Sequence, residues 1–170
     1  MTRPPRADST WRSTTRPPRE DEVTITPTGW YDVRVDAGLD DAAWDRLEQV
    51  GLAQSPGGWL AAPSPELLAV AEAHVGRQAR ELVRVKAAYF FAWQAEIAPV
   101  FRAIWPRLPG FSSASADGAS FWAGADEPGL EARYEPHALL VDGVVTRADW
   151  DAWHTALLAA TSHLPRHPEA

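Results

Sequence analysis

The sequence contains no cysteine, a single lysine and no long hydrophobic run. Without cysteine the chain cannot form disulfides, thiolate zinc sites or a cysteine nucleophile. The longest dense apolar run covers residues 87–93, whereas a membrane-spanning helix needs about 20 residues. The first 22 residues lack the apolar stretch of a secretory signal. We therefore expect a cytoplasmic protein with no membrane partner.

Motifs that mark common enzyme classes are also missing. The sequence has no P-loop, no Gly-x-Gly-x-x-Gly after a strand, no His-Glu-x-x-His and no Gly-x-Ser-x-Gly. Segment 36–47 weakly resembles a calcium loop in its spacing, but Asp41 occupies the required glycine position and Leu47 that of the bidentate glutamate. We expect no cofactor and no metal, and the missing motifs favour a protein that is not an enzyme.

Charge is distributed unevenly along the chain, whose formal net charge is −7. Residues 1–19 carry five arginines and one aspartate, whereas residues 20–170 carry 11 basic and 22 acidic side chains. This acidic part should repel nucleic-acid backbones and attract a basic protein. The alternative is that the acidity only maintains solubility. The expected partner is therefore another protein with a basic surface, and no nucleic acid.

The N-terminal segment has the composition of a disordered tail. Thr-Arg-Pro-Pro-Arg occurs at residues 2–6 and again at 15–19, and a segment so poor in apolar side chains cannot build a core. We predict a disordered Arg/Pro-rich tail over 1–22 and a single acidic α+β domain over 23–170. The tail is either an unstructured extension or an arm that docks on an acidic or SH3-like surface.

Helical signals predominate in the rest of the chain. Apolar periodicity predicts a helix over 41–50, and Ser64 and Thr146 are typical N-caps for helices over 65–95 and 147–160. Residues 82–93 fit either helix or strand, and we expect helix there, with a bend at Gly76. A last helical turn should cover 99–105.

Strand signals are fewer. An alternating pattern predicts a strand over 30–36, and Asp142-Gly143 between apolar runs predicts a tight hairpin within 133–145. Residues 109–129 are rich in Gly, Ser, Ala and Asp, and we expect either a long loop or a poorly regular pair of strands there. The predicted fold class is α+β, a helix-dominated single domain with a small antiparallel sheet and a disordered N-terminal tail.

Nine tryptophans make the sequence unusual. Trp59 and Trp122 lie in Gly-rich segments without helical period, so we predict that they bind a ligand or a partner. The alternative for any one tryptophan is burial in the core. Five others fit the core faces of predicted elements, namely Trp30, Trp44, Trp93, Trp150 and Trp153.

Residues 133–137 form the densest set of functional side chains. In an extended segment Arg133, Glu135 and His137 would share one face and Tyr134 the other. Arg133 and Tyr134 are predicted ligand or partner contacts. Glu135, His137 and His154 of the last helix are the candidates for proton transfer. The alternatives are a solvated edge strand with an internal ion pair and a His154 that borders the core.

Three functions remain open. The first is a small binding or accessory protein that acts by protein–protein interaction, for example an immunity-type or regulatory partner of a basic protein. The second is a ligand-binding protein or enzyme with an aromatic-lined pocket formed by Trp59, Trp122 and Tyr134. The third is a structural subunit of a larger assembly. The sequence leaves the oligomeric state open.

Overall fold

A computed structural model describes residues 19–33, 41–54, 59–76, 78–92, 97–122, 129–135 and 138–167. The strands are β1 (Glu22–Asp32), β2 (Ala53–Gln54), β3 (Leu60–Ala61), β4 (Arg80–Tyr89), β5 (Phe111–Ala114), β6 (Gly118–Phe121), β7 (Gly129–Glu135) and β8 (Ala138–Thr146). The helices are α1 (Asp41–Gln49), α2 (Pro65–Val75), α3 (Ile97–Ile104) and α4 (Arg147–Thr161), and a 3-10 turn, Trp105–Arg107, follows α3.

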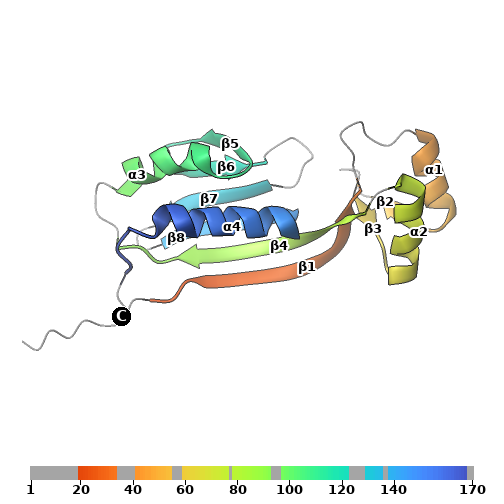
Figure 1. Ribbon diagram of the computed structural model, residues 1–170, viewed down its shortest axis with the longest axis horizontal. Coiled ribbons are helices and arrows are strands. Elements are labelled where there is room, and N and C mark those ends of the chain that lie inside the picture. Colours follow the sequence, from red (N-terminus) through yellow and green to blue (C-terminus); the bar gives the residue numbers. More distant parts are fainter. Residues whose placement is uncertain are drawn as a thin grey trace, which may run out of the picture.

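One antiparallel sheet dominates the structure (Figure 1). Its eight strands follow the order β2-β3-β1-β4-β8-β7-β6-β5, so that β5 to β8 form a meander and β4 lies between β1 and β8. The protein is α+β as predicted, but the prediction of a helix-dominated domain with a small sheet is wrong. The pairs at the centre of the sheet, β1 with β4 and β4 with β8, join segments that are distant in sequence, and local patterns do not reveal such pairing.

Helices α3 and α4 cover one face of the sheet (Figure 1). Side chains alternate across each strand, so β4 buries Val83, Val85 and Tyr89 under the helices and exposes Arg84 and Lys86 on the other face. The main core is rich in aromatic residues, and its largest fully buried side chains are Trp105, Trp150, Trp153, Tyr89, Phe91, Phe101 and Phe121.

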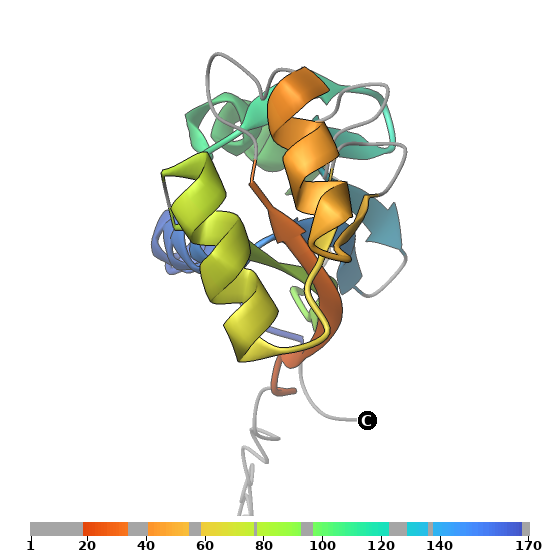
Figure 2. The same cartoon turned by 90° about the vertical axis from the view of Figure 1, so that its right-hand side faces the viewer.

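The elements α1, β2, β3 and α2 form a lobe at one end of β1 and β4 (Figures 1 and 2). The lobe has a small core of its own, made of Val33, Leu47, Leu52, Leu60 and Ala71. It joins the sheet where β3 pairs with the end of β1. The molecule therefore has one large core under the sheet and a smaller one in this lobe.

The predicted helix over 65–95 is wrong in its second half. Helix α2 ends at Val75, and residues that were expected to be helical form β4. Ser64 caps α2 as predicted, because its side chain accepts a hydrogen bond from the Leu67 N–H at 3.2 Å. Beyond Gly76, pairing with β1 on one side and β8 on the other outweighs the helical preference of the Ala, Gln and Glu residues in and around this segment.

The predicted hairpin turn at Asp142-Gly143 is also wrong, because β8 continues through both residues. A Cβ on Gly143, whose φ is +152°, would lie 2.0 Å from the carbonyl oxygen of Gly129 on β7. Glycine is therefore required here by the close approach of the neighbouring strand and not by a turn. The glycine marks tight strand packing, which a sequence pattern cannot distinguish from a turn.

Residues 109–129 were expected to form either a long loop or a poorly regular pair of strands, and they include the paired strands β5 and β6, whose register shifts between Phe111 and Ser113. One further boundary differs from the prediction. Strand β1 begins at Glu22, within the predicted tail, and ends at Asp32. Residues 1–18 lie outside the described residues.

The predicted helices over 41–50 and 147–160 are confirmed as α1 and α4. The side chain of Thr146 accepts a hydrogen bond from the Asp149 N–H at 3.1 Å, which begins α4 as expected. No helix in the described part of the chain has the length and apolar character needed to cross a membrane.

Candidate functional site

The second face of the sheet has no helix packed on it among the described elements. We call this surface, made by the outward residues of β1, β4, β8, β7, β6 and β5, the open face. Cross-strand pairing aligns one residue from each strand into a polar row, namely Thr24, Lys86, Asp142, Glu131, Ser120 and Ser113. A polar row on an uncovered sheet is accessible to a partner across its whole width.

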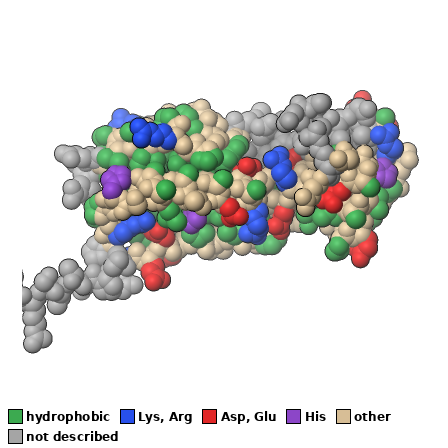
Figure 3. Space-filling model, viewed as in Figure 1, with side chains coloured by type: hydrophobic (Ala, Val, Ile, Leu, Met, Phe, Trp, Pro, Cys, Tyr) green, Lys and Arg blue, Asp and Glu red, His purple; other side chains and the backbone are tan. Residues whose placement is uncertain are grey.

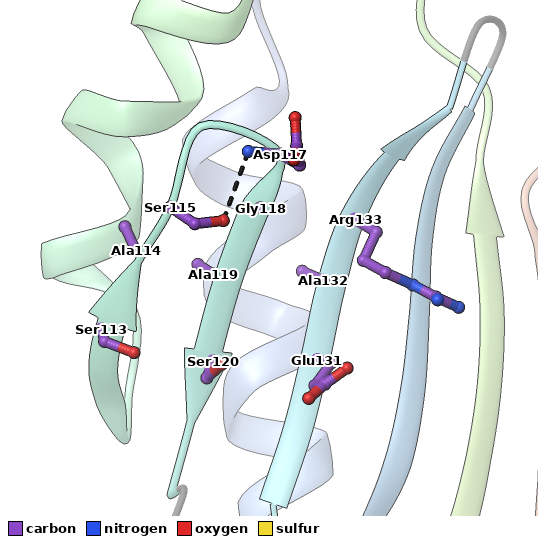
Figure 4. A pocket seen from close by; sticks show the side chains of 10 residues that line it. All are labelled: Ser113, Ala114, Ser115, Asp117, Gly118, Ala119, Ser120, Glu131, Ala132 and Arg133. Atoms are coloured by element: carbon purple, nitrogen blue, oxygen red, sulfur yellow. Dashed lines mark hydrogen bonds between the residues drawn. The ribbon is translucent and has the colours of Figure 1, made fainter.

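A hollow of about 250 Å³ lies on this face over β5, β6 and β7 (Figure 4). Its lining residues are mostly small: Ser113, Ala114, Ser115, Gly118, Ala119, Ser120 and Ala132. A Cβ on Gly118 would lie 2.0 Å from the Ala132 carbonyl oxygen, so glycine both permits the strand pairing and deepens the hollow.

The β5–β6 turn at the end of the hollow is held by hydrogen bonds. The Asp117 N–H donates to the Ser115 hydroxyl at 3.3 Å, which Figure 4 shows as a dashed line. The Ser115 N–H donates to the Gly118 carbonyl at 2.8 Å, and the Tyr134 N–H donates to the Asp117 carbonyl at 2.9 Å. These bonds fix the turn against β7 and thereby fix the shape of the hollow.

Two carboxylates of like charge are cross-strand neighbours beside this hollow. Glu131 on β7 pairs directly with Asp142 on β8, an arrangement that costs free energy. Arg133 compensates Asp142 through an ion pair of 3.1 Å, in which both side chains are about half exposed. Glu131 makes no ion pair within the described part of the chain. The hollow can therefore accept a cationic or hydrogen-donating group.

A second hollow of about 320 Å³ lies on the same face over β1, β4 and β8. Ala88 and Leu140 form its apolar part, and Lys86, the only lysine of the chain, stands beside it. Its polar lining side chains are Glu22, Thr24, Lys86 and Asp142. The open face thus has two depressions with mixed polar and apolar linings.

A tyrosine and a histidine, both able to transfer protons, are in contact under the helices. The Tyr89 hydroxyl is 2.5 Å from Nδ1 of His154, and the imidazole stacks on Trp150 with ring centroids 5.1 Å apart. Burial raises the pKa of Tyr89 well above its usual range and lowers that of His154. At neutral pH both groups are therefore uncharged, and the raised pKa argues against Tyr89 as a nucleophile.

An ion pair beside this contact ties the chain ends to the sheet. Arg166 binds Asp21 at 2.8 Å and lies over the ring of Phe91, 4.5 Å from its centroid. The Asp21 carboxylate also accepts a hydrogen bond from the Phe90 N–H at 3.2 Å. We infer that these contacts and the Tyr89–His154 pair have a structural role, in which they hold the neighbouring segments against the end of β4.

The predicted ligand-binding residues do not converge on one pocket. Tyr134 packs on the core side of β7, where its hydroxyl accepts a hydrogen bond from the Trp105 indole at 3.0 Å. Arg133 faces the opposite side of the same strand and borders the first hollow. Trp59 precedes β3 in the lobe and is partly buried. None of the three aromatic candidates lines either hollow described above.

Trp122 has an unusual backbone conformation at the end of β6. Its φ is +52°, the only positive value at a non-glycine residue in the described part of the chain. Its N–H donates to the Gly110 carbonyl at 2.6 Å, and a Cβ on Gly110 would collide with the indole at 2.1 Å. The indole packs against the main core, so packing explains much of its placement.

The predicted proton-transfer residues are also separated. Glu135 is exposed on the open-face side of β7, whereas His154 lies on α4 on the helical side of the sheet. His137 lies outside the described residues. No group of three or more metal-ligating side chains occurs in the described ranges. The described geometry therefore does not assemble Glu135 and His154 into one catalytic site.

Sequence reasoning missed the residues that shape the first hollow, namely Ser113, Gly118, Ser120 and Glu131. For the residues up to 129 the sequence left a loop or an irregular strand pair open, and it did not show which side chains would share a face. Comparisons with protein-family models, with curated proteins and with solved structures return no match. The geometry and charge of the site alone therefore support the function proposed below.

Proposed function

We propose that this protein is a binding protein that recognises a basic partner protein through the open face of its sheet. The observation that carries this proposal is the pair of like charges beside the first hollow. Arg133 neutralises Asp142, and a cation from a partner would do the same for Glu131. The expected cytoplasmic location is part of this proposal, since a protein without cysteine suits a reducing compartment.

The chemistry of the hollow favours an arginine or lysine side chain as the anchoring group. The small residues along β6 leave space beside the Glu131 carboxylate, and the hydroxyls of Ser113 and Ser120 can accept further hydrogen bonds. A guanidinium group is planar and donates several hydrogen bonds at once, so it suits a shallow polar depression on a flat sheet.

The charge of the rest of the molecule supports the same class of partner. The chain carries −7 overall, and acidic side chains also occur on the lobe (Figure 3). In helix α1, Asp41, Asp45 and Glu48 are exposed at a spacing that sets them on one side of the helix. A field of this sign accelerates the approach of a basic protein and weakens with salt.

A titration with a short arginine peptide tests the anchoring site directly. We expect amide NMR shifts centred on Ser120 and Glu131, and we expect Glu131→Gln to weaken peptide binding about three- to tenfold. Glu135→Gln is the matched control, because this residue lies on the same strand and face but outside the hollow. Equal effects of the two variants, or shifts centred elsewhere, would contradict the proposal.

Binding of a natural partner provides the second test. A protein retained by the wild type from a host extract should be lost with Ser120→Arg, which fills the hollow, and kept with Thr155→Arg on the exposed side of α4. The purified pair should bind more weakly as salt rises. A salt-independent affinity, or equal loss with both variants, would rule out recognition by the open face.

A further inference from the structure

Within the described part of the chain, the outer edge of β1 is unpaired over most of its length. On one side β1 pairs with β4 from Glu22 to Pro27, but on the other side β3 pairs only with Trp30 and Tyr31. Figure 1 shows β1 along the margin of the sheet, with the lobe confined to its far end. The backbone groups of residues 22–26 are thus available to another strand.

The two ends of the sheet differ in how they are protected. The opposite edge, β5, has only four residues and an irregular register between Phe111 and Ser113. In β1 the irregularity begins at Pro27, which leaves a regular stretch before it. Val23 on this stretch is 39% exposed. It is one of two large hydrophobic side chains that are exposed in the described part of the chain. A regular, partly apolar edge is typical of a strand that pairs with another chain.

We propose that β1 pairs with β1 of a second copy of this protein, antiparallel about a two-fold axis at Thr24. This register sets Val23 of each copy opposite Ile25 of the other on the helical side of the sheet, where Ile25 already packs against the core. Two β-branched pairs of this kind stabilise a strand contact. Thr24 meets its own symmetry mate, and no like charges face each other.

The charges on the open face are complementary in the same register. Glu22, which binds Arg19 of its own chain at 2.9 Å, lies opposite Thr26 of the other copy, and Thr26 pairs with Arg84 on β4. Strands two apart are separated by about 10 Å, a gap that the long Glu and Arg side chains can span across a threonine. Arg84 makes no ion pair within the described part of the chain. The same edge therefore offers apolar pairs on one face and opposite charges on the other.

The contact is small, so the dimer should dissociate on dilution. Sedimentation or light scattering should show a mass that rises with protein concentration toward twice the monomer mass. Val23→Lys should weaken the dimer about tenfold or more, because it sets a charge on the paired edge. Val70→Lys is the matched control, since Val70 on α2 has a similar exposure of 36% and lies away from the edge. A mass that stays at the monomer value, or equal effects of both variants, would overturn the proposal.

Cysteine cross-linking tests the register itself. The natural chain contains no cysteine, so a disulfide in a single-cysteine variant must join two copies. Thr24→Cys at the two-fold axis should form a disulfide dimer about tenfold faster than Ser113→Cys on the opposite edge, since directly opposed strand residues suit disulfide geometry. Equal rates of disulfide formation for the two variants would overturn the proposed pairing. Binding of a different protein along β1, in place of a second copy, would overturn it as well.

Discussion

At the scale of single residues, His154 shows how burial sets a charge state. Burial lowers the pKa of its imidazole, while Asp21 and Asp151 act in the opposite direction. The folded protein therefore favours the neutral ring, whose Nδ1 shares a hydrogen bond with the Tyr89 hydroxyl. A histidine in the unfolded chain titrates near about 6.5. The contribution of His154 to the free energy of unfolding is thus complete above that pH. It decreases as the pH falls toward and through the lower pKa that His154 has in the folded protein.

We expect His154→Gln to flatten the fall in stability between about pH 7 and pH 5, because glutamine does not titrate in this window. Urea unfolding at a series of pH values measures this slope. His163→Gln, at an exposed position just after α4, is the control and should leave the slope as in the wild type. Identical slopes for wild type and His154→Gln would show that the pKa shift of His154 has no effect on stability.

At the scale of elements, Gly118 determines how closely β6 can approach β7. We expect Gly118→Ala to lower the free energy of unfolding by about 1–3 kcal/mol, since its Cβ would meet the Ala132 carbonyl oxygen at 2.0 Å. Ser120→Ala, two residues along the same face, should change it by less than about 0.5 kcal/mol. Denaturant unfolding compares the two. If both variants changed the free energy of unfolding by similar small amounts, β6 would be able to move away from β7 without a loss of stability.

The elements that could be predicted are those with local signals at both ends. Helix α4 follows a capping threonine, and α2 follows Ser64 with Pro65 in the first turn. Strand β4 could not be assigned, because its alanines suit a helix and its register partners on β1 and β8 lie at least 48 residues away. Non-local hydrogen bonds decide such a segment, and a sequence window does not contain them.

At the scale of the whole molecule, the candidate site was hidden for the same reason. Ser113, Ser120 and Glu131 form one row only after β5, β6 and β7 pair in register. The acidic character of the chain was visible in the sequence, and it suggested a basic partner. The pairing that brings Glu131 beside Asp142, and so favours a bound cation, requires the fold.

The two hydrophobic cores should also differ in how they open. Among the described residues the lobe core contains five buried side chains, and the lobe joins the sheet through the short β1–β3 pairing. We expect Leu60→Ala, in the lobe core, to destabilise α1 and α2 by about 2–4 kcal/mol and to leave the amides of β8 unchanged. Native-state hydrogen exchange measures both regions at once.

Leu139→Ala, in the main core, provides the comparison for this experiment. It should accelerate exchange throughout the sheet and in the lobe as well, because the lobe is joined to the sheet through the pairing of β3 with β1. The lobe would then open locally while the sheet stays folded, but not the reverse. If Leu60→Ala accelerates exchange in β8 as much as in α2, the two cores unfold as one cooperative unit. The open face and the β1 edge would in that case lose their structure together with the lobe, and a variant in the lobe would weaken every contact proposed for the sheet.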